Sequence, residues 1–379
     1  MRNIYDVIVI GAGSMGMSAG YELSKRGLKT LLIDAFDPPH PNGSHHGEPR
    51  LIRHVYHGGE AYVRMALRAD ERWLELEEAT GEKLLERAGV LSIADPDVYK
   101  FDIRVDDARK HGVRLELLDA QEIGKRWKGI RTPDTFRALY EPDAGYLYSE
   151  KCIAAYRQQA LNAGATLLTN CFVTEVKADQ TSVTVRTKDD VFVAGQVLLS
   201  AGAWFKTLEP FVHLPIRAVR KTVGWFEPSG AAFDAGIFPG FSLITRNGGY
   251  YGFPSIDGAG VKIGRHDTGV EWTPGEPFEP FGDYPEDEGD IRAALEAYMP
   301  DAAGRLLRGA ACKYEMTSDD NFIIDFHPAY PNVLLAGGFS GHGFKFASVV
   351  GEITADLIEH RKSSQDLRLF AVSRFAPTT

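Results

Sequence analysis

The sequence has little cysteine and no long apolar run, and each absence excludes a class of protein. Only three of its 379 residues are cysteines, Cys152, Cys171 and Cys312, and no two of them form a CxxC pair. A disulfide scaffold and a cysteine-rich zinc site are therefore excluded, and a reducing compartment, the cytoplasm, is expected. No run of 18 apolar residues occurs and Asp6 interrupts the first apolar stretch, so we expect neither a transmembrane helix nor a signal peptide.

Positive charge is also scarce. Lys and Arg together number 42 against 52 Asp and Glu, which leaves a formal net charge of −10. Nucleic acids and anionic membranes are bound by clustered cations, so neither is an expected partner, and an acidic surface is compatible with a monomer. Hydrophobic residues at 44% and charged residues at 25% are typical of a globular enzyme, and the length suggests about two domains.

What the sequence does contain opens with a nucleotide-binding pattern. Residues 5–10 read YDVIVI, a β-branched run typical of a buried parallel strand. The glycine turn GAGSMG occupies residues 11–16, and a helix is expected over residues 14–26. A second strand, residues 29–33, ends at Asp34. This order of strand, glycine turn, helix, strand and acid predicts a dinucleotide site.

Each glycine in this turn has a physical role. Gly11 allows the tight turn, Gly13 lets the backbone approach a pyrophosphate, and Gly16 lets helix and strand pack closely. The helix N-terminus supplies N–H groups and partial positive charge for the phosphates. Asp34 lies 23 positions after Gly11, where its carboxylate can accept hydrogen bonds from an adenosine ribose. The acid disfavours NADP, whereas the pattern alone does not separate FAD from NAD.

The rest of the chain alternates between helical and strand periodicity. Helices are expected over residues 60–78, 150–163 (capped by Ser149), 291–299 and 344–360, and strands over 89–94, 181–186, 191–194, 196–200 and 333–336. Antiparallel strands are expected within 215–265, and an exposed acidic loop over 275–290. Nucleotide-type segments thus occur at both ends and in the middle. We predict an α/β fold in which a discontinuous Rossmann-like domain (1–85, 145–214 and 308–379) carries an inserted mixed-sheet substrate domain (86–144 and 215–307).

Several segments together resemble the family of monomeric sarcosine oxidases, with the N-methyl-tryptophan oxidases as its nearest sister group. They are GAGSMGMSAGYELSKRG, DAFDPPHPNGSHHGEPRLIRHVY, YYGFPS, GVKIGRH, CKYEMTSDDNFIIDFHP and LLAGGFSGHGFKFA. The resemblance runs in order through essentially the whole chain. It implies covalently bound FAD in the Rossmann-like domain and oxidation of a secondary amine, in which sarcosine, water and O2 give glycine, formaldehyde and H2O2.

The resemblance also implies which residues hold the flavin. Cys312 matches the cysteine that forms a thioether to the 8α carbon of the ring. Because a thiolate is the nucleophile, nearby cations should lower the pKa of this thiol, and Arg50, near the ring, is expected to help. On the pattern alone, a lone cysteine is more often a small buried hydrophobe. Further cofactor contacts are implied at Gly11, Gly13, Ser14, Met15, Gly16, Asp34, Ser44, His45, Arg50, Val173, Ala201, Gly202, Trp204, Gly341, His342, Gly343 and Lys345.

Three cations are implied to act on the reactants. Arg53 and Lys345 match the two ligands of the substrate carboxylate, since a carboxylate that enters an apolar pocket must be paired. The alternative for Arg53 is a structural ion pair. Lys262 matches a lysine near flavin N5, where a fixed cation would stabilise the charge that develops as O2 is reduced. On the pattern alone, Lys262 would be a solvated strand residue.

Aromatic residues and histidines complete the implied pocket. His266, Tyr251 and Tyr314 match residues that would shape the amine end, and His342 matches one beside the flavin. Packing is the alternative for each of them. The pocket should hold the reactive neutral amine by desolvating it, which lowers the amine pKa, before a hydride equivalent passes from the N-methyl carbon to the flavin.

Two positions depart from the family pattern. Pro49 stands where a threonine is common, and Ser242 stands where a larger methionine is common. The smaller side chain predicts a substrate range wider than sarcosine. An oxidase of N-methyl-tryptophan or of another bulky secondary amine therefore stays open as an alternative, because it differs only in the size of the pocket.

Other classes of protein are disfavoured on single features. An NAD(P)-dependent or quinone-coupled amine dehydrogenase shares the glycine pattern, but only one GxGxxG is present. A nonenzymatic nucleotide-binding module has no need of the Arg53 and Lys345 pair. A metal site is not expected, because no helical HExxH-type spacing occurs among His40, His45, His46, His54 and His57.

Overall fold

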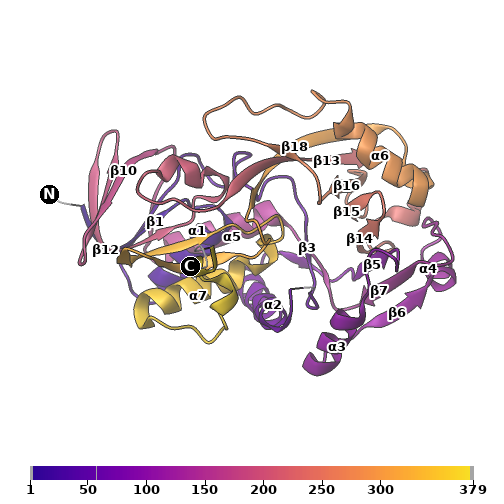
Figure 1. Ribbon diagram of the computed structural model, residues 1–379, viewed down its shortest axis with the longest axis horizontal. Helices are drawn as coiled ribbons and strands as arrows, with labels where there is room; N and C mark the ends of the chain where they lie inside the picture. The colour runs from indigo at the N-terminus through magenta and orange to yellow at the C-terminus, as the bar shows by residue number, and fades with distance from the viewer. Residues whose placement is uncertain (1–2, 57, 376–379) are drawn as a thin grey trace.

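Two large sheets, one of eight strands and one of nine, occupy opposite ends of the molecule (Figure 1). The computed structural model describes residues 3–56 and 58–375, so His57 lies outside the described residues. The predicted α/β class is confirmed. The residue boundaries of the two domains stay a prediction.

The eight-stranded sheet holds the predicted nucleotide-binding segments. Its main path runs β10–β11–β12–β1–β2–β9, and β20 pairs with both β12 and β19. The central strand β1 is parallel to β2 and β12. Its strands are β1 (Asn3–Ile10), β2 (Thr30–Ile33), β9 (Thr166–Leu168), β10 (Val173–Ala178), β11 (Val183–Thr187), β12 (Val191–Leu199), β19 (Ile323–His327) and β20 (Tyr330–Gly337).

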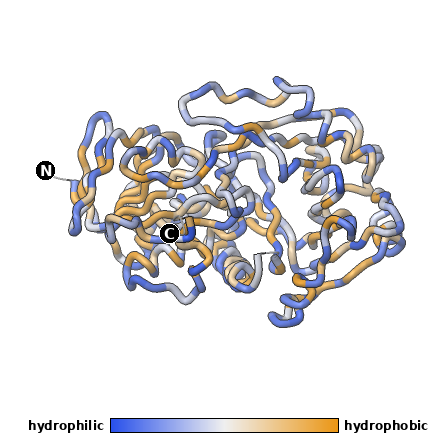
Figure 2. The backbone as a smooth tube through the Cα atoms, in the orientation of Figure 1, coloured by the Kyte–Doolittle hydropathy of each residue, from blue (hydrophilic) through white to orange (hydrophobic). Residues whose placement is uncertain are grey.

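The second half of strand β1, residues 7–10, is apolar and buried because both of its faces are covered. Successive side chains point to opposite sides of a strand. Val7 and Val9 pack into a core formed with the helices, whereas Ile8 and Ile10 pack into a second core formed with β10–β12 and the 3₁₀ segment η1 (Gly202–Leu208). The helices on the first face are α1 (Ser14–Lys25), α2 (Glu60–Thr80), α5 (Ser149–Asn162) and α7 (Ala347–His360). In Figure 2 the apolar colour is concentrated in this interior.

The nine-stranded sheet has the order β17–β13–β16–β15–β14–β5–β7–β6, with β18 paired to β13. Phe241 and Leu243 of β14 pack into a core with α6, whereas Ser242 and Ile244 face a cavity. Its elements are β5 (Val90–Ala94), α3 (Asp102–His111), β6 (Glu116–Asp119), α4 (Ala120–Arg126), β7 (Arg137–Glu141), β13 (Arg217–Phe226), β14 (Gly240–Thr245), β15 (Gly248–Phe253), β16 (Val261–Arg265), β17 (Val270–Glu271), α6 (Glu286–Tyr298) and β18 (Leu306–Met316). A small sheet of β3 (Arg50–Ile52), β8 (Gly145–Leu147) and β4 (Leu85–Glu86) lies between the two.

Three local expectations were wrong. Strand β12 runs unbroken through Gly195, where two strands were predicted, because its first half pairs with β11 and its second half with β20. Helix α6 begins at Glu286, inside the predicted loop, and its acidic first turn suits the positive end of the helix. Ser149 is the first residue of α5 and donates to the carboxylate of Glu150 instead of capping the helix.

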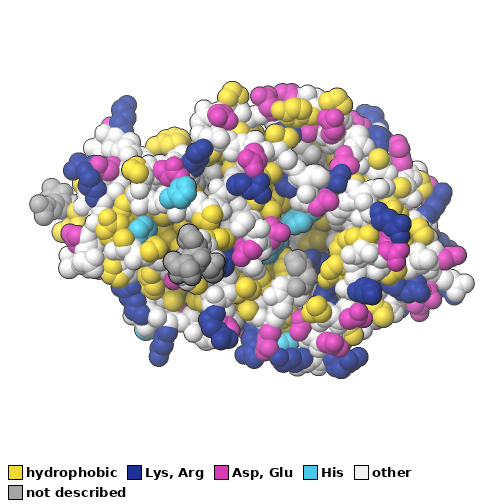
Figure 3. Space-filling model, in the orientation of Figure 1, with side chains coloured by type: hydrophobic (Ala, Val, Ile, Leu, Met, Phe, Trp, Pro, Cys, Tyr) yellow, Lys and Arg dark blue, Asp and Glu magenta, His cyan; other side chains and the backbone are white. Residues whose placement is uncertain are grey.

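Charges of both signs are mixed over the face shown in Figure 3. Among the described residues, no helix combines the length and the apolar character needed to cross a bilayer.

Candidate active site

A cavity lies at the carboxyl ends of β1, β2 and β12. In an open sheet of parallel strands, nucleotides bind at this edge. Most of the predicted cofactor residues line the cavity: Gly11, Gly13, Ser14, Met15, Asp34, Ser44, His45, Val173, Ala201, Gly202 and Trp204.

The glycine turn has the shape that a dinucleotide requires. Gly11 has φ +92°, and a Cβ atom on Gly16 would overlap the carbonyl oxygen of Gly11. A Cβ atom on Gly13 would meet nothing nearer than Nδ1 of His45, at 3.8 Å. Close packing therefore leaves no room for a side chain at Gly16, whereas the space beside Gly13 is open toward the cavity. The turn fits the FAD pyrophosphate, which would approach the backbone at Gly13.

Asp34 is fixed at the rim of the cavity by the chain around it. Its Oδ2 accepts a hydrogen bond from the Ala12 N–H at 2.7 Å, and its Oδ1 accepts one from the Phe36 N–H at 2.9 Å. Nε2 of His40 lies 3.2 Å from the same Oδ1. A carboxylate held in this way suits the ribose hydroxyls of an adenosine.

His45 is a neutral side chain in this cavity. Burial lowers its pKa to about 3, and repulsion from His40 acts in the same direction. Its Nε2 accepts the His40 N–H at 3.1 Å, which assigns the ring proton to Nδ1. His45 can therefore donate a hydrogen bond from Nδ1 but carries no charge for a phosphate.

The nucleotide cavity continues through a smaller hollow into a third one. Ser14, Ser44 and Glu315 line both the first and the second hollow, and Tyr314 and Gly341 line both the second and the third. Arg50 and Gly343 also line the second hollow. The three hollows form one path from the nucleotide edge of the first sheet to the face of the second.

The third hollow, the predicted substrate pocket, contains both predicted carboxylate ligands. Arg53 Nη1 lies 3.3 Å from the hydroxyl of Ser92 and 3.4 Å from that of Ser242. Lys345 Nζ donates to the carbonyl of His342 at 2.8 Å, and burial, with repulsion from Arg53, holds its pKa well below the usual value. Within the described chain, neither cation forms an ion pair with a carboxylate.

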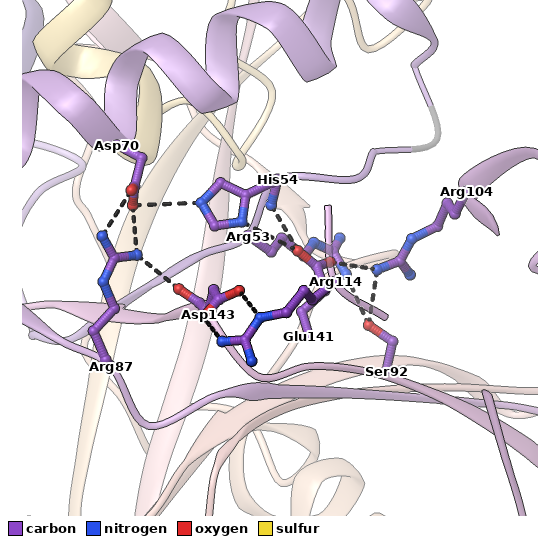
Figure 4. Close-up of polar contacts among 9 residues, drawn as sticks. All are labelled: Arg53, His54, Asp70, Arg87, Ser92, Arg104, Arg114, Glu141 and Asp143. Carbon is purple, nitrogen blue, oxygen red and sulfur yellow. Dashed lines mark hydrogen bonds and ion pairs between the residues drawn. The ribbon is translucent and has the colours of Figure 1, made fainter. Parts of the chain in front are cut away.

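A buried polar cluster, which Figure 4 shows, lies against the pocket. Glu141 accepts the His54 N–H at 2.8 Å and a hydrogen bond from Arg104 at 3.2 Å. Burial disfavours the charged form of His54, but hydrogen bonds to Asp70 and Glu141 raise its pKa to about 9. Arg104 also donates to Ser92 and lines the pocket.

The predicted aromatic residues and histidines meet in the same pocket. Tyr251, Tyr314, His266 and His342 all line it, and the Tyr314 hydroxyl donates to that of Tyr251 at 3.3 Å. Burial raises the pKa of Tyr251 to about 12 and that of Tyr314 further. Both phenols are therefore neutral hydrogen-bonding groups at ordinary pH.

Lys262 lies against the loop that contains Gly47 and Pro49. Its Nζ donates to the carbonyls of Gly47 and Pro49, and it lies 5.2 Å from the centre of the Trp225 ring. Burial and repulsion from Arg50 hold its pKa well below the usual value. Arg50 donates to the same two carbonyls, so both cations hold one turn of the chain.

Cys312 lies in β18, two residues from Tyr314, and packs with it on one face of the strand. Burial raises the pKa of this thiol, although Arg50, Lys262 and Lys221 act to lower it. The expected cations are present, but they do not lower the pKa of the thiol overall, because burial has the larger effect.

Three predicted residues do not line the three hollows: Gly16, Lys262 and Cys312. Sequence reasoning missed Arg104, Glu141 and Glu315. No local signal marks Arg104, because it lies in a short helix with little apolar patterning. The described residues contain no group of three or more His, Cys, Asp or Glu side chains that could hold a metal ion.

Comparison with known proteins agrees with this geometry. Residues 6–357 match the FAD dependent oxidoreductase family, and the chain belongs to that family. Its similarity extends over the whole fold to L-proline dehydrogenase from P. horikoshii, with a TM-score of 0.86 and 23% identity over 99% of this chain and 98% of that one.

Within the family, the chain groups with the sarcosine oxidases, as its motifs indicated. It is 46% identical to monomeric sarcosine oxidase from a Bacillus species over 378 residues, 99% of this chain and 97% of the relative. It is 42% identical to N-methyl-L-tryptophan oxidase from Escherichia coli over 373 residues, 98% of this chain and 99% of the relative. The resemblance drawn from the motifs is thereby confirmed.

Proposed function

We propose that this FAD-dependent oxidoreductase oxidises sarcosine and other N-methyl amino acids, with O2 as the acceptor. Sarcosine, water and O2 would give glycine, formaldehyde and H2O2. The observation that carries the proposal is the pair Arg53 and Lys345. Both are basic side chains of one pocket, and neither pairs with a carboxylate of the described chain. A substrate carboxylate would supply the missing charge.

Each group in the pocket has a part in this reaction. FAD, when bound, would supply the redox chemistry between the substrate and O2. Arg53 and Lys345 orient the substrate through its carboxylate. Tyr251 and Tyr314 present neutral hydroxyls and ring faces, which favour the neutral amine that has to react. Lys262 supplies positive charge beside the loop of Gly47.

The covalent link, compartment and assembly belong to the same proposal. Cys312 would form the thioether to the flavin, and Arg50, Lys262 and Lys221 would favour its thiolate. A reducing compartment, the cytoplasm, keeps this thiol free until the flavin reaches it. The mixed surface charge is compatible with a monomer. The small Ser242 supports oxidation of bulky N-methyl amino acids, N-methyl-tryptophan included.

The visible spectrum of the purified protein tests the flavin before and after acid precipitation. We expect yellow colour that stays with the pellet in the wild type and in the control Cys152→Ser, and colour that moves to the supernatant in Cys312→Ser. Anaerobic sarcosine should bleach the native protein, and air should restore the colour with release of H2O2. Colour released from the wild type would remove the covalent link, and a colourless protein that takes up no FAD would overturn the whole proposal.

A further inference from the structure

The substrate pocket contains one more cation than a single carboxylate needs. Arg104 lines it together with Arg53 and Lys345, although its side chain comes from α3, outside every predicted site. Arg104 is only 3% exposed. A guanidinium is always charged, so its place in a buried wall requires a compensating anion.

The two arginines meet at one hydroxyl group. Arg53 Nη1 lies 3.3 Å and Arg104 Nη2 lies 3.2 Å from Oγ of Ser92 (Figure 4). Two positive groups that share one neutral acceptor repel each other, and this repulsion, added to burial, holds the pKa of Arg104 below its usual value. An anion placed between them would turn the repulsion into two charged hydrogen bonds.

The carboxylates of the chain satisfy this demand only in part. Glu141 is the carboxylate that Arg104 reaches, and it also pairs with His54 through Nδ1 at 3.5 Å. Within the described residues, both hydrogen bonds that Arg104 donates leave from Nη2, and Nη1 donates none. Arg104 therefore keeps binding capacity beyond its contact with Glu141.

The wall beside Arg53 carries a small side chain, Ser242. It lies next to Ser92 on the neighbouring strand, with its hydroxyl 3.4 Å from Arg53 Nη1, and Tyr99 and Ile244 also line the pocket. A side chain that extends past Arg53 toward Ser242 passes into the reach of Arg104. The guanidinium groups of Arg53 and Arg104 and the hydroxyl of Ser92 meet at this end of the pocket, and this arrangement suits an anionic side chain.

We propose that the preferred substrates are N-methyl amino acids whose side chain carries a second carboxylate, and that Arg104 binds this second carboxylate. The α-carboxylate lies on Arg53 and Lys345, as for sarcosine, and the distal one on Arg104 and Arg53. The reaction is otherwise that of the proposed function, on which this inference rests: the N-methyl carbon is oxidised, O2 is reduced to H2O2, and water releases formaldehyde and the acidic amino acid.

The decisive measurement compares acids with their neutral amides on the native holoenzyme. N-methyl-L-aspartate and N-methyl-L-glutamate should exceed N-methyl-L-asparagine and N-methyl-L-glutamine in kcat/KM by about tenfold or more, because a charged hydrogen bond is lost in each amide. Glutarate should also inhibit sarcosine oxidation more tightly than butyrate, and should shift the visible spectrum of the flavin at lower concentration. Amides that equal the acids, with butyrate equal to glutarate, would overturn the inference.

Variants then assign the preference to Arg104. Arg104→Met should remove the acid-over-amide preference, whereas Arg104→Lys should keep part of it. The matched control is Arg109→Met, an exposed arginine on the same helix. Because Arg104→Met removes one of the two partners of the buried Glu141, the double variant with Glu141→Gln serves if the single one does not fold. A preference that survives the loss of Arg104 would overturn the assignment.

Sarcosine separates the two proposals. If the enzyme oxidises sarcosine but shows no preference for the acids, only this inference fails. If no N-methyl amino acid is oxidised, the proposed function fails.

Discussion

Glu315 is a buried carboxyl group at the point where the nucleotide cavity meets the second hollow. Its Oε2 accepts the Gly338 N–H at 3.1 Å, but this hydrogen bond does not offset burial, which raises its pKa to about 8. Near neutral pH the side chain is therefore protonated and can donate a hydrogen bond into the cavity.

This shift makes stability depend on pH. The native state keeps the proton of Glu315 up to about pH 8, whereas the unfolded chain releases it near pH 4.5. The native state binds more protons between these values, so its stability should fall as pH rises through this window, by up to about 1.4 kcal/mol per pH unit. Glu315→Gln removes the titration, and its stability relative to the wild type should increase from pH 5 to pH 8.

Thermal unfolding at several pH values measures this difference, with the exposed Glu276→Gln as control. A gap between Glu315→Gln and the wild type that does not change with pH would contradict the raised pKa.

At the scale of elements, the crossing of α1 and α7 holds the nucleotide turn in place. Gly351 of α7 lies against Ser18 of α1, and a Cβ atom there would overlap the serine hydroxyl. Gly351→Ala should force the helices apart and lower the free energy of unfolding by about 1–3 kcal/mol. Denaturant titration checks this value.

Gly289 in α6 provides the opposite case. A Cβ atom on Gly289 would meet nothing within 4 Å. Gly289→Ala should stabilise the protein by roughly 0.5–1 kcal/mol, because alanine loses less backbone freedom in a helix. If Gly351→Ala and Gly289→Ala changed the free energy of unfolding equally, the close packing of α1 on α7 would not explain the effect of Gly351→Ala.

Predictability from sequence also depends on the element. β1, α2 and α7 were predicted because each carries a long local pattern, and the glycine turn with Asp34 was found because its residues lie close together in sequence. The contacts of Arg104 could not be predicted from local sequence patterns. Ser92 and Glu141 become neighbours only when β5 pairs with β7, and this pairing brings together residues some fifty positions apart. Arg53 and Lys345 were found through family motifs, not through local patterning.

At the scale of the whole molecule, FAD should stabilise the fold by binding. The path for it runs from the first sheet to the second, so a bound flavin contacts both. In Cys312→Ser, where the cofactor binds reversibly, FAD at one hundred times its Kd should add about 2.7 kcal/mol. The Tm of this variant should rise with FAD and stay constant with NAD. A rise with NAD alone would favour the dehydrogenase alternative.

The position of β1 has a consequence for the order of events during synthesis. This first strand lies inside its sheet, between β2 and β12, and β12 in turn pairs with β20. A ribosome has to deliver residues 191–199 before the second edge of β1 is covered, and residues 347–360 before α1 meets α7. The nucleotide cavity, which Ala336 and Phe339 also line, is therefore complete only after these residues have been synthesised. A nascent chain that already carries the glycine turn should not bind FAD until residues 347–360 have left the ribosome.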